Sequence, residues 1–203
     1  RRDFTIMDRE DANDLIKTWP SRPSGFRLAG QVLVERHRAS EAIDLMEDTL
    51  HRIEDGGLRT QLAAIYFQDG QRAKAEQHLR RAIHVNPTYT PAFDLLYLHL
   101  MERGDAAAGR KLMEEKFHHN QNLETALQLA AHDDALGARH LAEELLERAG
   151  RDFIHNQETF ARIGDFWLNR GEFSRARRWY EVGLTQNAAV RGLYTGRLAE
   201  VLL

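Results

Sequence analysis

Apolar residues recur along this chain at the i, i+3, i+4 spacing that places them on one face of a helix, and strand-like alternation is confined to short runs. The clearest stripe consists of Leu58, Leu62, Ile65 and Tyr66. It is followed by Asp69-Gly70, where the glycine can take the left-handed conformation that ends a helix. A second stripe consists of Ala75, Leu79, Ala82 and Ile83 and stops before Asn86-Pro87. The pattern predicts two short helices joined by a tight turn, an αα-hairpin.

This hairpin pattern recurs every 33 or 34 residues. One column reads Gly30, Ala63, Tyr97, Ala130 and Gly164, and the turn column reads His37, Gly70, Gly104, Gly137 and Gly171. A period near 34 is typical of stacked helical repeats, in which each unit buries its apolar face against its neighbours. The sequence predicts five repeats, over 23–55, 56–89, 90–122, 123–156 and 157–190. We interpret residues 1–22 as an N-terminal helix that could belong to a preceding repeat, and 191–203 as the first helix of a further repeat or a cap.

Two of these repeats resemble the tetratricopeptide (TPR) family. The first carries Leu62-Ala63, Tyr66, Gly70, Ala75, Leu79, Ala82 and Pro87, and the second Phe160, Ile163-Gly164, Trp167, Gly171, Ala176, Tyr180 and Gly183. The resemblance covers roughly residues 23 to 203. It implies an all-α fold, a right-handed superhelical solenoid of about five helix-turn-helix units with partial flanking helices. It says little about function, because the pattern residues build the stack.

Two positions depart from the TPR pattern. Tyr97 stands in the small-residue column, and we expect Gly109 on the partner helix to make room for it. Asp133 stands where the family has a buried aromatic residue, and an unpaired buried carboxylate is costly. Either Asp133 points to solvent while Leu136 takes over its packing, or the 123–156 repeat is out of register by one residue.

The composition excludes several classes of partner. The net charge is −3 and 29% of the residues are charged, with both signs interleaved, so nothing favours nucleic acid or an anionic membrane. The chain has no cysteine and no apolar run of the ~18 residues that a membrane span needs. It begins Arg1-Arg2-Asp3 without an initiator methionine, and we expect it to be a segment of a longer protein.

No reaction or metal site is predicted. The 10 histidines include the pairs His118-His119 and His78/His84 and the run His132-Asp133-Asp134, but none has the i, i+4 spacing of a two-histidine metal site. No nucleophile elbow, phosphate loop or dinucleotide fingerprint occurs. We therefore expect no enzyme activity, no cofactor and no metal. The clusters Arg80-Arg81 and Arg175, Arg177 and Arg178 have acidic residues nearby and are interpreted as solvated faces.

The resemblance places the functional surface on the concave side of the array, lined by the first helix of each repeat. The corresponding columns give the expected partner-binding residues: Arg27, Gln31, Val34, Thr60, Phe67, Gln68, Asp94, Leu98, Met101, Leu127, Asp165, Leu168 and Asn169. Glu35, Ala64, Ala131, Asp134 and Ala161 lie on the same columns. The middle of this set is apolar and its ends are polar, which suits an amphipathic helix or extended peptide of a partner protein. Thr60, Ala64 and Asp94 replace the cationic set that captures acidic chaperone tails, so we expect no such ligand.

Three interpretations stay open. The first is a scaffold that binds a partner segment in the groove. The second is a structural or oligomerisation module acting through its ends, because Tyr194, Leu198, Val201, Leu202 and Leu203 leave an apolar C-terminal helix. The third is an analogy: similar arrays occur in periplasmic parts of bacterial exopolysaccharide exporters. The sequence leaves cytoplasm and periplasm open, and only that analogy favours the periplasm.

Overall fold

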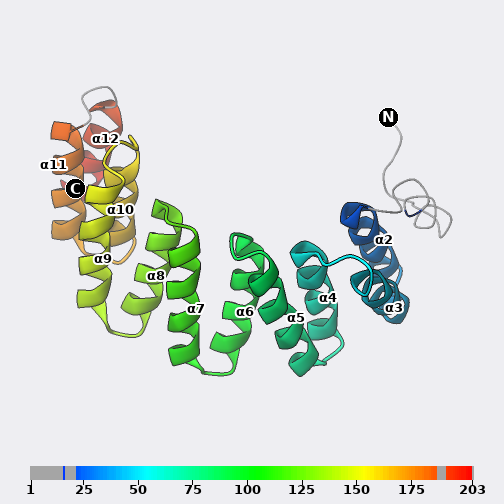
Figure 1. The fold of residues 1–203 in the computed structure, drawn as a ribbon. Helices are drawn as coiled ribbons and strands as arrows, with labels where there is room; N and C mark the ends of the chain where they lie inside the picture. Colours follow the sequence, from blue (N-terminus) through cyan, green and yellow to red (C-terminus); the bar gives the residue numbers. More distant parts are fainter. Residues whose placement is uncertain (1–15, 17–21, 187–190, 203) are drawn as a thin grey trace. The chain divides into compact units, whose positions relative to one another are not determined.

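The computed structural model describes residue 16 and residues 22–186 and 191–202. Within these residues all regular structure is helical, eleven helices in sequence, which confirms the predicted all-α class (Figure 1). The chain divides into two compact units, with the boundary between Leu112 and Met113 inside one helix. Most of the predicted N-terminal helix within residues 1–22 lies outside the described residues.

Unit 1 contains two and a half helix pairs. They are α2 (Pro23–Glu35) with α3 (Ala39–Leu50), α4 (Gly56–Gln68) with α5 (Arg72–Val85), and α6 (Thr90–Glu102) with the first half of α7 (Ala106–His119). Several ends follow from local chemistry. Asp55 caps α4 by accepting the Leu58 N–H at 2.7 Å, and Pro91 lies in the first turn of α6, where a missing N–H costs little.

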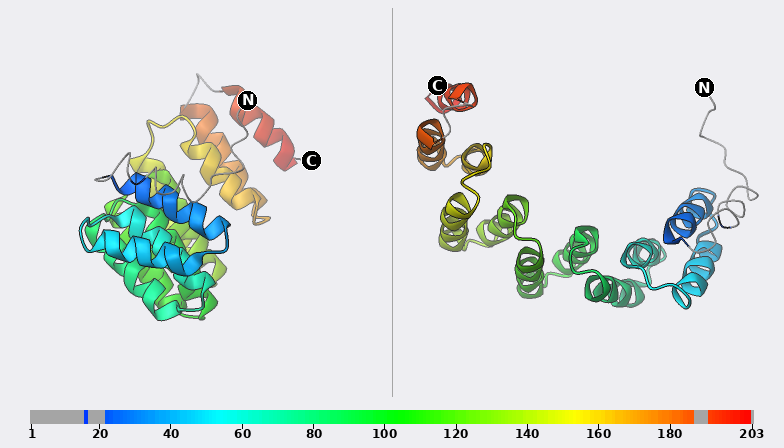
Figure 2. Two further views of the ribbon diagram at one scale, coloured as in Figure 1. Left: turned by 90° about the vertical axis from the view of Figure 1, so that its right-hand side faces the viewer. Right: turned by 45° about the horizontal axis from the view of Figure 1, so that its top comes forward.

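Unit 2 continues the pairing. It holds the second half of α7, then α8 (Leu123–Ala135) with α9 (Arg139–Asp152), α10 (Thr159–Leu168) with α11 (Phe173–Gln186), and α12 (Arg191–Leu202). Two further views show the helices of each pair side by side (Figure 2). Asn122 caps α8 as Asp55 caps α4, accepting the Thr125 N–H at 3.0 Å.

The predicted turn column is confirmed by the backbone. Gly70, Gly104, Gly137 and Gly171 have φ between 71 and 80°, and His37 has φ 59° at the corresponding turn of the first pair. After Gly70 the chain closes the helix by the Gln71 N–H donating to the Tyr66 carbonyl at 2.8 Å. A histidine is strained in this conformation, because only glycine lacks the Cβ that opposes it.

The small-residue column marks close helix contacts. A Cβ added at Gly30 would overlap the end of Met46, and one added at Gly164 would overlap the Tyr180 ring. Gly183 meets the ring of Tyr194 on α12 in the same way. These glycines let a large side chain of the neighbouring helix lie against the backbone.

Two expectations are wrong. Asp133 is 2% exposed and Leu136 49% exposed, the reverse of the proposed exchange, and Gly137 sits in the same left-handed turn as the other glycines, so α8–α9 is not shifted at its turn. Asp133 has an interaction partner, which is how a carboxylate is tolerated there.

Tyr194 does not lie on an exposed C-terminal surface: it is buried, and its hydroxyl donates to the Gln157 carbonyl at 2.7 Å. Leu198 and Val201 are half-buried, whereas the side chains of Leu202 and Leu203 lie outside the described residues.

Candidate partner-binding site

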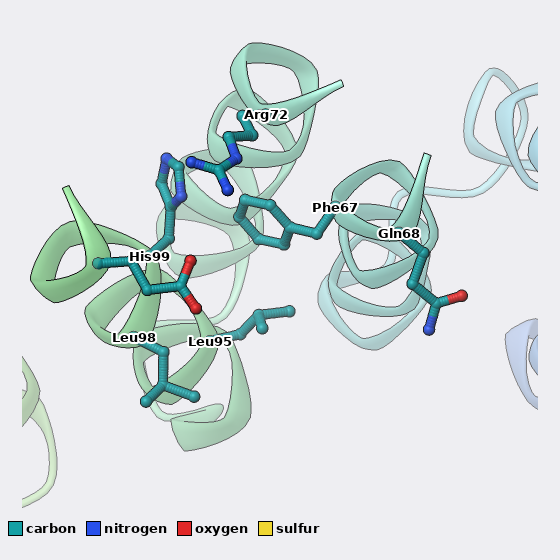
Figure 3. Close-up of a pocket in the computed structure, with 7 residues that line it drawn as sticks. Phe67, Gln68, Arg72, Leu95, Leu98 and His99 are labelled. Carbon is teal, nitrogen blue, oxygen red and sulfur yellow. The ribbon is translucent and has the colours of Figure 1, made fainter. Parts of the chain in front are cut away.

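Unit 1 contains a hollow of about 290 Å³ between α4, α5 and α6, here called the unit 1 hollow. It is lined by Phe67, Gln68, Arg72, Leu95, Leu98, His99 and Glu102 (Figure 3). Three of these, Phe67, Gln68 and Leu98, belong to the groove predicted from the sequence. The structure thus brings part of the predicted set together and adds residues from α5 and α6.

The hollow exists because α6 is apolar on more than one face. Phe93, Leu96 and Leu100 are buried against the other helices, which leaves Leu98 on the opposite side at 59% exposure. Leu95 and Phe67 beside it are half-buried. A single exposed leucine is ordinary, but a leucine that shares an open hollow with a phenylalanine and a second leucine is a candidate contact surface.

His99 forms the buried wall of the hollow. It is 4% exposed, and its ring centroid lies 4.7 Å from that of Phe67. Its Nε2 is 3.5 Å from Glu76 Oε2, whereas Nδ1 is buried and has no hydrogen-bond partner within the described residues. Buried polar atoms are nearly always paired, so this nitrogen stands out.

The Glu76 carboxylate next to His99 forms ion pairs with two arginine side chains. It accepts from Arg80 Nη2 at 2.7 Å and from Arg103 Nη1 at 2.8 Å. Burial alone would raise the pKa of Glu76, but the hydrogen bond from Arg80 and the charges of Arg80 and Arg103 outweigh it and lower that pKa. Both arginines are therefore ion-paired within the fold.

Arg72 differs from them. It is exposed at the first position of α5, and the described part of the chain offers its guanidinium no ion pair. Glu102, the carboxylate that lines the hollow from α6, is also exposed. The hollow therefore has an apolar wall, one available cation and one acidic residue.

The remaining predicted groove positions are spread over both units. In unit 1, Arg27, Val34 and Met101 are half-buried, Gln31 and Asp94 are exposed, and Thr60 is buried with its hydroxyl donating to the Gly56 carbonyl at 2.8 Å. In unit 2, Leu127 and Leu168 are half-buried and Asn169 is exposed. Thr60 was expected at the surface, but its hydroxyl serves its own helix.

The Asp165 side chain also makes its hydrogen bonds within the fold. Its carboxylate accepts from the Tyr180 hydroxyl at 2.7 Å and from Arg197 Nε and Nη2 at 2.6 and 2.8 Å. Burial would raise its pKa, but the bonds from Arg197 and Tyr180 outweigh burial and lower it. Nearby, Asp134 accepts from Arg139 at 2.8 Å and Arg170 at 2.7 Å. The groove columns of unit 2 thus carry internal ion pairs.

Comparison with known proteins decides the family of folds. No protein-family model and no curated protein matches the sequence. The C-terminal part of a TPR repeat-containing protein from Cytophaga hutchinsonii superposes with a TM-score of 0.60 over 95% of this chain and 78% of that chain, at 13% identity. The fold is that of a TPR protein.

Two further TPR structures agree. A tetratricopeptide repeat protein from Parabacteroides merdae has a TM-score of 0.51 over 88% of this chain and 72% of its own, at 14% identity. YrrB, described as a TPR protein with an unusual peptide-binding site, has a TM-score of 0.51 over 93% of this chain and 98% of its own, at 11% identity. At these identities the likeness shows the TPR fold alone.

The basic clusters of this TPR fold are paired. Arg81 lies 3.6 Å from Glu54, Arg175 3.2 Å from Glu143, Arg177 2.7 Å from Glu181 and Arg178 2.7 Å from Glu147. The interpretation of these arginines as solvated, ion-paired faces is confirmed. Among the described residues no group of three histidine, aspartate or glutamate side chains could hold a metal ion, and no described helix has the length and hydropathy to cross a bilayer.

Sequence reasoning missed Arg72, Leu95, His99 and Glu102. The groove columns were taken from the first helix of each TPR unit, which leaves out Arg72 on the second helix. His99 was not predicted, because the histidines were considered only as metal ligands. Its signal was its position three residues after Leu96 in an apolar helix, a spacing that places the two side chains on one face.

Proposed function

We propose that this chain is a non-catalytic scaffold that binds a segment of a partner protein on the side formed by the first helices of its TPR pairs. The observation that carries this proposal is the unit 1 hollow, in which Phe67 and the exposed Leu98 present apolar surface beside polar groups that the fold leaves available. Side-chain anchors in such a hollow, with a polar rim, are how grooves take amphipathic helices or extended peptides.

The proposed contact path begins at the hollow. In unit 1 it includes Phe67, Gln68 and Leu98, which line the hollow, and the half-buried Val34 and Met101 from the predicted columns. The other predicted groove residues of unit 1, Arg27, Gln31 and Asp94, are part of the same proposal, whereas Leu127, Leu168 and Asn169 of unit 2 stay separate predictions. Thr60 and Asp165 are left out of it, because both side chains already make hydrogen bonds within the fold.

A capture experiment with three baits tests this function. The baits are the wild type, the double variant Phe67→Glu/Leu98→Glu, and the matched control Leu136→Glu/Phe173→Glu. The control adds the same charges at an exposed leucine and an exposed phenylalanine of unit 2. The proposal expects partners retained by wild type and control to be lost from the first double variant. Equal retention by all three baits contradicts it.

Assembly through the C-terminal helix stays a prediction. Tyr194 faces the interior, so such an interface would rest on half-buried Leu198 and Val201. Sedimentation velocity over a range of protein concentrations checks it, and a monomer throughout removes it.

A further inference from the structure

The polar end of the unit 1 hollow is formed by Arg72 and His99. Figure 3 shows the Arg72 guanidinium, the His99 ring and the Phe67 ring pointing toward one another, with Leu95 and Leu98 at the other end in this view. The hollow therefore has one apolar end and one end with hydrogen-bonding capacity, and both belong to the same three helices.

The neighbouring Glu76 carboxylate indicates which nitrogen of the His99 ring donates a hydrogen bond and which can accept one. Glu76 Oε2 lies 3.5 Å from Nε2, and because a carboxylate only accepts, this contact favours the tautomer with the hydrogen on Nε2. Nδ1 is then an acceptor. It is buried and, within the described residues, receives no donor. A bound group that supplies an O–H or N–H would satisfy it.

The position in unit 2 that corresponds to Arg72 is an arginine with a carboxylate partner. The turns at Gly70 and Gly137 are equivalent and 67 residues apart, so Arg72 corresponds to Arg139 and Phe67 to Asp134. In unit 2, Asp134 accepts a 2.8 Å hydrogen bond from Arg139. In unit 1 a phenylalanine stands in place of that carboxylate, so within the described residues the exposed Arg72 guanidinium can donate to an acceptor on a ligand.

We propose that the unit 1 hollow binds a tyrosine side chain of the partner segment, an inference that rests on the proposed function. The ring lies against Phe67, Leu95 and Leu98, and the hydroxyl donates to His99 Nδ1 while its oxygen accepts from Arg72. The volume of about 290 Å³ is at the low end for ligand pockets, which suits one side chain. Because Nδ1 is out of contact with solvent, the proposal requires the side chains that cover it to move when the hydroxyl binds.

Other side chains fit less well. A carboxylate could accept from Arg72, but it has no proton for Nδ1 and would lie near the acidic Glu102, which lines the same hollow. A phenylalanine would fill the apolar end and leave both polar groups unpaired. Only a phenol combines an apolar ring with a group that both donates and accepts.

The first test uses small probes and NMR. N-acetyl-tyrosinamide is titrated against N-acetyl-phenylalaninamide and N-acetyl-glutamic acid amide while the signals of Leu95, Leu98 and His99 are followed. The tyrosine probe is expected to bind about five- to tenfold tighter than the phenylalanine probe, the worth of about one hydrogen bond. Arg72→Gln should reduce this ratio, whereas Arg81→Gln, a matched change elsewhere on α5, should leave it unchanged.

Three outcomes overturn the inference. They are equal affinity for the tyrosine and phenylalanine probes, tighter binding of the glutamic acid probe, and no shift at these residues up to about 20 mM, above the millimolar Kd expected for a ligand this small.

A second test separates this inference from the proposed function. Peptides are selected from a random display library on the wild type and then measured against Phe67→Glu/Leu98→Glu. Peptides that lose binding to the double variant and carry a tyrosine whose change to phenylalanine weakens binding support both proposals. Peptides that depend on the hollow without any tyrosine preference overturn the inference and leave the function standing. Binding that ignores the double variant overturns the function.

Discussion

The unit 1 hollow and its counterpart in unit 2 use the same repeat positions in opposite ways. Positions shift by 67 residues between the turns at Gly70 and Gly137, and again between Gly104 and Gly171. Where unit 1 has Phe67, Leu98 and His99, unit 2 has Asp134, Asp165 and Phe166. The two aspartates are bonded to Arg139, Arg170 and Arg197, and the Arg170 guanidinium lies 3.5 Å from the Phe166 ring centroid.

The comparison shows that the helix stack accommodates either apolar or ion-paired residues at these positions. Residues that hold helices together, such as the turn glycines, recur in both units, whereas the outward positions are free to be apolar or ionic. In unit 2 the arginines are satisfied by the chain itself. In unit 1 apolar surface is left open beside Arg72, which has no ion-pair partner among the described residues, and we therefore assign binding to unit 1.

The largest effect is expected where a glycine meets an aromatic ring. Gly164→Ala would place a methyl group into the Tyr180 ring, which is held by its bond to Asp165, and should destabilise unit 2 by about 3 kcal/mol. Gly30→Ala meets only the flexible end of Met46 and should cost about 1 kcal/mol. Amide hydrogen exchange in α10–α11 and α2–α3 measures the two costs, and equal values would show that the ring yields as easily as the methionine.

Exchanging the outward residues separates folding from binding. Asp165→Leu leaves the Tyr180 hydroxyl without its acceptor and Arg197 without its partner, and should cost about 2 kcal/mol. Leu98→Asp changes a side chain that is 59% exposed, so it should alter stability by less than about 0.5 kcal/mol while abolishing partner binding. Denaturation and binding assays on both variants check this. A strongly destabilised Leu98→Asp would mean that Leu98 holds the fold.

The turns offer a smaller comparison. His37→Gly should stabilise unit 1 by about 0.5–1 kcal/mol, because glycine adopts φ 59° without strain even after its greater entropy in the unfolded chain is counted. Gly137→Ala at the equivalent turn of unit 2 should destabilise it by about 1 kcal/mol. The unfolding temperatures of the two variants should shift in opposite directions from that of the wild type. A shift in the same direction would refute the assignment of strain to His37.

The smallest expected effect is pH dependence in unit 1. Burial and then the charge of Arg59 lower the pKa of His78, so between that value and the ordinary pKa near 6.5 the unfolded chain binds more protons than the folded one. Stability should therefore be fully present above about pH 6.5 and fall as the solution is acidified below it. His78→Gln should flatten this dependence in the hydrogen exchange of α5. An unchanged slope would place its source elsewhere.

The repeat pattern predicted the fold because its residues are required by local backbone conformation and close helix contacts. Gly70 takes a positive φ and Gly164 admits a ring, and both needs appear as fixed positions in the sequence. The site was predicted only in part. Phe67 and Leu98 lie on first-helix columns, but Arg72 became relevant only once α5 was packed beside α6, and Asp133 was wrongly placed because its partner could not be inferred from spacing.

The most direct test of the central claim is photo-crosslinking from the hollow itself. p-Benzoylphenylalanine is placed at Leu98 in one protein and at Leu136 of unit 2 in another, both exposed positions. We predict that a partner captured by the wild type crosslinks from position 98 and not from position 136. Crosslinking from position 136 alone would contradict the assignment of binding to unit 1.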